Sequence, residues 1–389
     1  MSLLGSDTTR GGFVPPVYPF DKLGELAELA AAHDGGAVDL SVGTPCDPPP
    51  PQVVRALGHS GRERGYPTSI GSVELREAAA AWMERRFGVS VSPSAIAACV
   101  GTKELVAGVP HWLRLRRPSQ DTVLCPALAY PTYEMGALLA GCRAVPVPAG
   151  SDGSMQLSAV DEQDAERALC LWVNSPANPS GQLDDLGAAA RWGRERGIPV
   201  FSDECYVEFT WSSAGRTILE HGDSGVVAVH SLSKRSNLAG LRVGLFAGDP
   251  ELVEYLAALR RHAGFMVPGP VQHAGAVAFG DDLHVLRQRE IYLERLQRFA
   301  ASLGGLGIPA EVPAGSFYLW VAVPDRFAGG GGDQSPAFAF GRHLARAGGI
   351  LSSPGDAYGP SGRGHVRLAM VQPVDRLDLG LERLGRFAD

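Results

Sequence analysis

The chain lacks the features that mark several large classes of protein. No apolar run reaches the roughly 20 residues that a membrane-spanning helix needs. The formal net charge is -7, and a chain without surplus positive charge is a poor candidate for broad nucleic-acid binding or for a basic membrane-surface helix. The first dozen residues contain no basic region followed by an apolar run, so we expect no secretory signal. These absences predict a cytoplasmic protein with no nucleic-acid or membrane partner.

Cysteine is sparse and forms no recognisable pattern. The six cysteines are scattered along the chain, and none belongs to a CxxC pair. Most lie in apolar segments, which is typical of buried, reduced thiols in a cytosolic protein. A zinc site is therefore not expected, and we predict no metal.

The length of 389 residues exceeds one ordinary hydrophobic core and suggests about two domains. Apolar runs that read as buried strands alternate with helical patterns, and these runs are Ala95–Val100, Thr122–Cys125, Ala144–Val147, Leu169–Val173, Val200–Ser202, Val226–His230 and Leu245–Ala247. Such alternation predicts an α/β fold with a mostly parallel sheet sandwiched by helices, which binds ligands at the carboxyl ends of its strands. Beyond Ala276–Asp282 the alternation is less regular. We therefore expect a large domain over 41–280 and a smaller α+β domain made of 1–40 and 281–389.

The segment VVAVHSLSKRSNLAGLR combines a strand with groups that suit a phosphate and a carbonyl ligand. Ser231, Ser233 and Lys234 follow the apolar run directly, and Arg242 comes eight residues after the lysine. Hydroxyls and a guanidinium donate well to phosphate oxygens. A deprotonated lysine at the carboxyl end of a strand can condense with a carbonyl. The competing interpretation is a solvated Ser/Lys turn.

An acidic residue, Asp203, follows another apolar run in VFSDECY. A buried carboxylate is unfavourable without a partner. The ring nitrogen of pyridoxal phosphate (PLP) is one such partner, because a carboxylate can keep it protonated and make the ring an electron sink. Tyr206 is then placed to donate to the phenolic oxygen of the ring. The alternative is a helix N-cap or a turn acid.

Three further segments carry weaker signals. In LWVNSPANPSG, Asn178 offers an amide to the ring oxygen and to a substrate carboxylate, although the segment also reads as a turn-rich loop. In CVGTKE, Gly101 and Thr102 stand between a strand and a helix that begins near Lys103, so backbone N–H groups are available to a phosphate. In AYPTY, Tyr130 suits stacking on an aromatic cofactor, although a Tyr-Pro pair more often packs in a core.

Taken in order, GTKE, AYPTY, NPSG, SDECY and SLSK, with an arginine eight residues after the lysine, resemble the class I/II aminotransferases of PLP fold type I. The resemblance runs from about Phe13 to the C-terminus. Longer segments, VHSLSKRSNLAGLRVGLFAGDP, RRHAGFMVPGPVQ and GILSSPGDAYGPSGRGHVRLAM, are similar to the actinobacterial N-succinyldiaminopimelate aminotransferases of lysine biosynthesis. The resemblance implies an enzyme that moves an amino group between glutamate and a 2-oxo acid, with PLP as cofactor.

The resemblance also implies roles for individual residues. Lys234 is the Schiff-base lysine and general base, Asp203 pairs with the ring nitrogen, and Tyr206 and Asn178 contact the ring oxygen. The expected cofactor contacts are, in addition, Gly101, Thr102, Lys103, Tyr130, Ser231, Ser233 and Arg242. Arg367 grips the α-carboxylate of the substrate, and Gly43 lines the same pocket. Tyr66 reaches the cofactor phosphate of a neighbouring subunit, which implies a homodimer with shared active sites.

Three questions stay open at this level. The remote carboxylate of a succinylated substrate calls for a cation, and Lys103, Arg235 and Arg261 are candidates. A PLP β-eliminating lyase on the same fold shares the cofactor residues, and so does an aminotransferase of another specificity. A PLP-binding regulator of transcription needs a basic N-terminal domain, for which the residues before about Leu40 leave no room.

Overall fold

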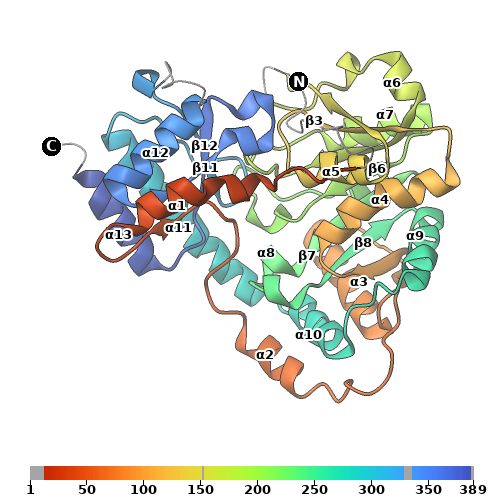
Figure 1. Ribbon diagram of the computed structural model, residues 1–389. Coiled ribbons are helices and arrows are strands. Elements are labelled where there is room, and N and C mark those ends of the chain that lie inside the picture. The colour runs from red at the N-terminus through yellow and green to blue at the C-terminus, as the bar shows by residue number, and fades with distance from the viewer. Residues whose placement is uncertain (1–12, 151–152, 328–334, 387–389) are drawn as a thin grey trace. The chain divides into compact units, whose positions relative to one another are not determined.

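The computed structural model describes residues 13–150, 153–327 and 335–386 and contains two compact units. The larger unit comprises Thr44–Leu293 and Pro313–Ser316, and the rest of the chain forms the smaller unit. Figure 1 labels the α-helices and some of the strands of both units. Among the described residues, no helix combines the length and the apolar composition that crossing a bilayer requires.

A seven-stranded sheet forms the centre of the larger unit. In spatial order its strands are β2 (Ile96–Cys99), β8 (Gly244–Gly248), β7 (Val226–Ser231), β6 (Val200–Asp203), β5 (Ala168–Asn174), β3 (Thr122–Pro126) and β4 (Arg143–Val147). β8 is antiparallel to both of its neighbours, and all other adjacent pairs are parallel. Each of the seven apolar runs forms one of these strands, and the mostly parallel α/β sheet is confirmed.

Helices cover both faces of this sheet. One face packs against α3 (Val73–Phe87), α7 (Leu186–Arg196) and α10 (Gly269–Gly280). The other packs against α4 (Thr102–Arg116), α5 (Thr132–Leu139) and α9 (Pro250–His262). Because side chains alternate along a strand, Val226 and Ala228 of β7 lie in the first core, and Val227 and Val229 lie in the second. Burial on both faces explains why these strands read as continuous apolar runs.

Local signals set the ends of the covering helices. Ser72 caps α3, since its hydroxyl accepts a hydrogen bond from the Leu75 N–H. Gly88 ends the same helix in the left-handed conformation, at φ 70°, where a side chain would be strained. Asp185 caps α7 by accepting from the Ala188 N–H. Such caps make short amphipathic helices well defined before they pack on the sheet.

The smaller unit contains two small sheets and a layer of helices. Its antiparallel sheet has the order β11 (Ser353–Pro354), β12 (His365–Ala369) and β9 (Tyr318–Ala322). β1 (Val38–Asp39) pairs in parallel with β10 (Ile350–Leu351). The helices of this unit are α1 (Gly24–Ala31), α12 (Pro336–Gly348), α13 (Val374–Gly385) and the second half of α11 (Leu283–Gly305).

The division between the units falls at residues 293 and 294, inside α11, whereas the sequence placed the boundary near Ala276–Asp282. α10 belongs to the larger unit because Ala278 and Phe279 pack in the core between the sheet and helices α3 and α7. Residues 313–316 also belong to the larger unit, where the Gly315 N–H donates to the Gly181 carbonyl over 2.9 Å. These tertiary contacts have no signature in local hydrophobic periodicity.

Candidate active site

Most of the candidate residues lie at one edge of the seven-stranded sheet. β2, β7, β6, β5 and β3 run in the same direction, so their carboxyl ends meet at that edge. The chain leaves those ends through the segments with Thr102, Lys234, Asp203, Asn178 and Tyr130, respectively. Arg242 reaches the same edge because it precedes β8, which runs the opposite way. Ligands of open α/β sheets bind at such an edge.

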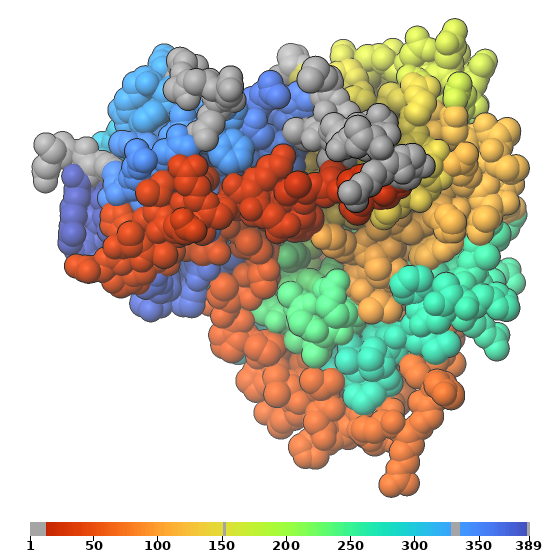
Figure 2. Space-filling view, in the orientation of Figure 1, coloured from red at the N-terminus to blue at the C-terminus, as the bar shows by residue number. Residues whose placement is uncertain are grey.

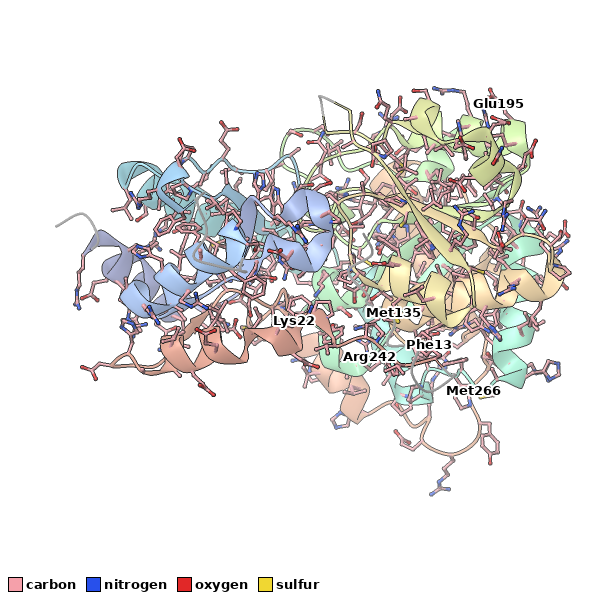
Figure 3. The ribbon with its side chains drawn as sticks, turned by 45° about the horizontal axis from the view of Figure 1, so that its top comes forward. Phe13, Lys22, Met135, Glu195, Arg242 and Met266 are labelled. Atoms are coloured by element: carbon pink, nitrogen blue, oxygen red, sulfur yellow. The ribbon has the colours of Figure 1, made fainter. Side chains whose placement is uncertain are left out.

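The start of α4 and Arg242 form a cradle for an anion. Gly101 precedes the helix at φ 72°, and a Cβ atom built on it would lie 2.1 Å from Nη2 of Arg242. Only glycine therefore lets the guanidinium, labelled in Figure 3, approach the helix so closely. The 15-residue helix directs its first backbone N–H groups and the positive end of its dipole to this point. Cation, dipole and the Thr102 hydroxyl together suit a phosphate group.

Asp203 ends β6 as a buried carboxyl group with two donors. The Tyr133 hydroxyl donates to Oδ2 over 2.8 Å, and the Cys205 N–H donates to Oδ1 over 3.2 Å. Burial raises the pKa of Asp203, while these hydrogen bonds and the positive charge of Lys234 lower it. A cation beside the carboxyl oxygens of Asp203 would offset the remaining desolvation cost of ionising it. The carboxyl group is thus suited to a protonated ring nitrogen.

Tyr133 and Asn174 are two site residues that the sequence reasoning missed. Tyr133 is fully buried and stacks on Trp172 at a centroid distance of 5.3 Å. Asn174 donates from Nδ2 to the Asp203 carbonyl over 2.8 Å and accepts from the Asn178 N–H over 2.7 Å. Asn174 therefore links two of the segments that leave the sheet. The available signals were the second tyrosine of AYPTY and the asparagine that ends the apolar run LWVN.

Lys234 lies on α8 (Leu232–Arg235), one helical turn that directly follows β7. Ser231 caps this turn, since its Oγ accepts from the Ser233 N–H over 3.1 Å. The chain contains three lysines, and the other two, Lys22 and Lys103, are exposed. Lys234 is half-buried, and its charge is close enough to lower the pKa of Asp203. It is the one lysine at the carboxyl end of a central strand.

Other candidates near this edge differ in exposure. Tyr206 and Asn178 are buried, at 6% each, and Tyr130 is half-buried with its ring edge-on to Tyr133. Tyr66 is 98% exposed, so it packs against almost nothing in its own chain. It belongs to the segment after α2 (Pro51–Gly58), which protrudes in orange in Figure 2.

The smaller unit holds the remaining two candidates, and these contact a shared tyrosine. Arg367 of β12 is buried and donates from Nη2 to the Ser41 carbonyl over 2.6 Å. Its guanidinium carbon lies 4.1 Å from the ring centre of Tyr318 and 4.9 Å from that of Tyr358. A Cβ atom on Gly43 would lie 1.9 Å from the Tyr318 hydroxyl, so this position requires glycine. Aromatic faces on a guanidinium fix its plane, which is what recognition of a carboxylate needs.

Arg235 is not available to read a substrate carboxylate, contrary to one of the sequence hypotheses. It is 3% exposed, and its guanidinium already forms ion pairs with Glu208 and Asp282 at 3.0 and 2.9 Å. Moving this buried guanidinium to a ligand would break both ion pairs and its hydrogen bond to the Ala278 carbonyl. Lys103 and Arg261 are both exposed and remain candidates.

A buried acid and a buried histidine lie beside the site. Oε2 of Glu204 and Nε2 of His230 are 3.4 Å apart, and both residues are almost fully buried. Burial raises the pKa of Glu204 to about 8 and lowers the pKa of His230 to about 3. Both groups are therefore mainly uncharged at neutral pH.

This pair predicts a loss of stability as the pH rises from 6.5 to about 8. The folded-state pKa of Glu204 lies above the ordinary value of 4.5, so its contribution is complete below that pH and is lost as the pH rises to 8. The slope is about 1.4 kcal/mol for each pH unit. The lowered pKa of His230 affects stability only below its ordinary pKa of 6.5. Between pH 6.5 and 8, Glu204 is therefore the member of the pair that changes stability. The free energy of unfolding, measured in urea, should decrease over this pH range for the wild type and stay nearly constant for Glu204→Gln. Parallel declines would contradict the assignment.

The residues at the strand ends fit PLP. The cradle at Gly101, which a Cβ atom would fill, suits a phosphate beside Thr102 and Arg242. The buried carboxyl group of Asp203 suits the ring nitrogen, and Lys234 offers an amine that suits the aldehyde group. Phosphate donors, an acid and a lysine on neighbouring strand ends match the three polar ends of the cofactor.

Comparison with known proteins supports this interpretation. The profile described as aminotransferase class I and II matches residues 36–384. A probable aminotransferase of Mycobacterium tuberculosis is 40% identical over 99% of this chain and 89% of that protein. The 4-dedimethylamino-4-oxo-anhydrotetracycline transaminase OxyQ of Streptomyces rimosus is 39% identical over 95% of this chain and 99% of that protein.

Among solved structures, the probable N-succinyldiaminopimelate aminotransferase of Thermus thermophilus is 30% identical. It aligns with a TM-score of 0.83 over 95% of this chain and 100% of that chain. Sequence profile, relatives and structure thus agree over nearly the whole length. The chain belongs to the class I and II aminotransferases and is a transaminase that uses PLP.

Proposed function

We propose that the enzyme moves an amino group between glutamate and N-succinyl-2-amino-6-oxopimelate in the diaminopimelate route to lysine. The observation that carries the amino-transfer chemistry is the placement of Lys234, Asp203 and the Arg242 cradle at adjacent strand ends. The named relative from Thermus thermophilus supports the choice of a succinylated acceptor. A buried arginine clamped by tyrosines, Arg367, supports a substrate with an α-carboxylate.

Each residue has a distinct task in this proposal. When bound, PLP supplies a conjugated ring that withdraws electrons from the substrate Cα. The ε-amine of Lys234 would remove the Cα proton as a general base and then, as a general acid, deliver it to the carbon that carried the aldehyde. Asp203 holds a proton at the ring nitrogen, and Tyr206 and Asn178 donate to the ring oxygen. Tyr130 stacks on the ring.

The phosphate end is held by groups that take no part in proton transfer. The Thr102, Ser231 and Ser233 hydroxyls, the Lys103 N–H and the Arg242 guanidinium serve as donors. Because a phosphate dianion binds the positive end of α4, this end fixes the cofactor while bonds change at the other.

Arg367 should be needed equally in both half-reactions, because every amino-acid and oxo-acid substrate has the carboxylate that it binds. Arg367→Lys keeps the charge but loses the two-pronged geometry. We expect a loss of about 1.5–3 kcal/mol in kcat/KM for glutamate and for the oxo acid alike. Cofactor affinity should hardly change. Arg376→Lys is the matched control, since Arg376 belongs to the same unit and donates to the carbonyls of residues 35 and 37. A loss confined to one half-reaction would refute the shared role.

The substrate itself is tested by a panel of acceptors with glutamate as donor. The panel should contain the succinylated oxo acid, pyruvate and a polycyclic ketone. The ketone is included because of the 39% identity to the tetracycline-pathway transaminase. We expect the succinylated acceptor to give the highest kcat/KM. Preference for the ketone would support that second function, and formation of ammonia with pyruvate from a β-substituted amino acid would indicate a lyase.

Loss of the residue that binds the remote carboxylate should affect the succinylated acceptor and pyruvate differently. Lys103 and Arg261 are the two exposed candidates. For whichever of them binds this carboxylate, replacement by Met should lower kcat/KM for the succinylated acceptor more than for pyruvate. Equal effects of both variants on both acceptors would exclude Lys103 and Arg261 from this role.

We also propose a homodimer in which Tyr66 serves the partner's site. Tyr66 has 98% of its surface exposed, so contacts with its own chain stabilise it little. In a symmetric dimer it would contact the cofactor phosphate of the partner subunit. Mixing the inactive variants Lys234→Ala and Tyr66→Asp should restore activity, because one site of each mixed dimer is intact. At a 1:1 ratio about a quarter of wild-type activity is expected for a twofold-symmetric dimer. Full activity of a monomer would rule out the arrangement.

A further inference from the structure

We propose that the buried ion pair between Arg235 and Glu208 is a positioning clamp that sets the orientation of Lys234 relative to Tyr206. The inference rests on the proposed function, because it assigns Lys234 and Tyr206 to the cofactor. Arg235 directly follows Lys234 on α8. Glu208 comes two residues after Tyr206, in the short 3-10 turn Val207–Phe209. Nε of Arg235 and Oε1 of Glu208 are 3.0 Å apart.

The clamp joins segments that leave neighbouring strands. β6 and β7 are paired in parallel, with Asp203 opposite Val229. The chain therefore leaves both strands at the same edge, and each segment carries one proposed cofactor residue. Beyond the ends of the strands, the backbone ladder no longer sets their separation. The pair of Arg235 and Glu208 supplies a side-chain link there.

α8 needs such an anchor because it is only four residues long. One helical turn gains too few hydrogen bonds to hold its own orientation. Successive helical residues point about 100° apart, so fixing the Arg235 side chain fixes the direction of Lys234. The fully buried Leu232 and the guanidinium of Arg235 are the anchors on this turn.

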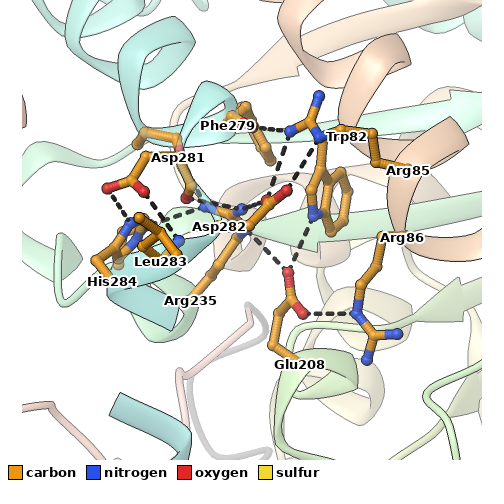
Figure 4. A network of polar contacts seen from close by, with 12 residues as sticks. Trp82, Arg85, Arg86, Glu208, Arg235, Phe279, Asp281, Asp282, Leu283 and His284 are labelled. Carbon is orange, nitrogen blue, oxygen red and sulfur yellow. Dashed lines mark hydrogen bonds and ion pairs between the residues drawn. The ribbon is translucent and has the colours of Figure 1, made fainter. Parts of the chain in front are cut away.

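The guanidinium is held from several sides, as Figure 4 shows. Besides Glu208, it donates to the Ala278 carbonyl over 2.6 Å and to Oδ1 of Asp282 over 2.9 Å. The rings of Trp82 and Phe279 each have their centre 5.5 Å from its central carbon. Arg235 thus ties α8 to the junction between α10 and α11, which is part of the same unit.

Charge neutralisation alone does not explain Arg235. Glu208 also accepts from Arg86 over 2.8 Å and from Trp82 over 2.9 Å, and Asp282 also pairs with Arg85 at 2.9 Å. Burial raises the pKa of Glu208, but the charges of Arg235 and Arg86 outweigh burial and lower it. Loss of Arg235 therefore leaves both carboxylates with another arginine. Arg235 is the residue of this cluster that connects Glu208 to the turn that carries Lys234.

This redundancy provides a matched pair of variants. Arg235→Met breaks the link between the two segments. Arg86→Met removes the same charge from the same carboxylate but leaves Arg235 and Glu208 together. Arg235→Met should lower the thermal midpoint of the apoprotein more than Arg86→Met, since the Arg235 side chain is 3% exposed and the Arg86 side chain 26%. The clamp is therefore tested on the holoenzyme, by the spectrum of the bound cofactor and by the rate.

The two variants should differ in the properties of Lys234. In the holoenzyme, the visible absorption of the bound cofactor changes with pH as the nitrogen linked to Lys234 titrates. Arg235→Met should move that midpoint by about one pH unit and slow the glutamate half-reaction by about 100-fold, the scale for misplacement of a reacting group. Arg86→Met should leave the midpoint in place and the rate within a few-fold of the wild type. Arg235→Lys, which can still pair with Glu208, should recover part of both effects.

The outcomes separate this inference from the proposed function. Identical midpoints and rates for Arg235→Met and Arg86→Met would overturn the clamp. If Arg235→Met does not fold, Glu208→Leu removes both acceptor oxygens and breaks the same pair from the other side, and an unmoved midpoint in that variant would overturn the clamp equally. Borohydride reduction of the wild type tests the proposed function independently, because cofactor found on a residue other than Lys234 would contradict it whatever the clamp variants do.

Discussion

Lys234→Ala should abolish turnover while leaving a folded protein that still binds PLP. The variant loses the amine that holds the cofactor and the base that moves the Cα proton. The loss of the base alone accounts for about 10²–10⁴-fold, and the loss of the covalent attachment adds to this. Lys234 is half-buried at the end of β7 and caps no helix, so its removal should affect folding little. Steady-state kinetics and the absorption spectrum of the holo variant provide the measurement.

Two controls make the Lys234 result specific. Lys103→Ala removes the exposed lysine at the start of α4 and should keep the visible band of bound cofactor. Methylamine added to Lys234→Ala should restore part of the glutamate half-reaction, because a free amine can take the place of the missing side chain. A band and a rate that survive in Lys234→Ala would show that another residue holds the cofactor.

Asp203→Asn should leave PLP bound but slow the half-reaction with glutamate by about 10²–10³-fold, the scale for removal of one preorganised electrostatic partner. The amide keeps the shape of the carboxyl group: its oxygen can still accept from the Cys205 N–H, and its NH2 group can donate to the Tyr133 hydroxyl oxygen. It cannot hold the ring nitrogen in its protonated form. Stopped-flow absorbance measures the rate, and equilibrium dialysis measures cofactor affinity, which the phosphate cradle should maintain.

Tyr133→Phe is the companion variant for Asp203. It removes one donor to Oδ2 but leaves the carboxylate in place, so its effect should be smaller than that of Asp203→Asn. Near-normal turnover of Asp203→Asn would show that the carboxylate does not act on the ring.

Much of the larger unit could be predicted from the sequence because its strands are buried on both faces. β5 and β7 are entirely buried, and their apolar runs ended within one residue of the observed strands. The polar residues that follow such a run necessarily reach the ligand-binding edge of a parallel sheet. This is why Lys234, Asp203 and Asn178 could be placed at that edge from the sequence alone.

The residues that sequence reasoning missed act through tertiary contacts. Tyr133 is 70 positions before Asp203, and its hydroxyl reaches the carboxylate only because α5 packs on the face of the sheet where Trp172 and Phe201 also lie. Arg235 was a candidate for the remote carboxylate of the substrate, but its carboxylate partners are Glu208 and Asp282, 27 and 47 positions away. Likewise the boundary inside α11 depends on how α10 packs, which no local periodicity reports. Pairings at such separations are set by the fold and leave no pattern in either segment.

The most direct test of the central claim is borohydride reduction of the PLP-loaded enzyme, followed by proteolysis and mass measurement of the labelled peptide. The chain has three lysines, Lys22, Lys103 and Lys234, so assignment is unambiguous. We predict that the reduced cofactor is found on Lys234 and that prior incubation with glutamate prevents the labelling. Cofactor on Lys22 or Lys103, or labelling that glutamate does not affect, would contradict the account.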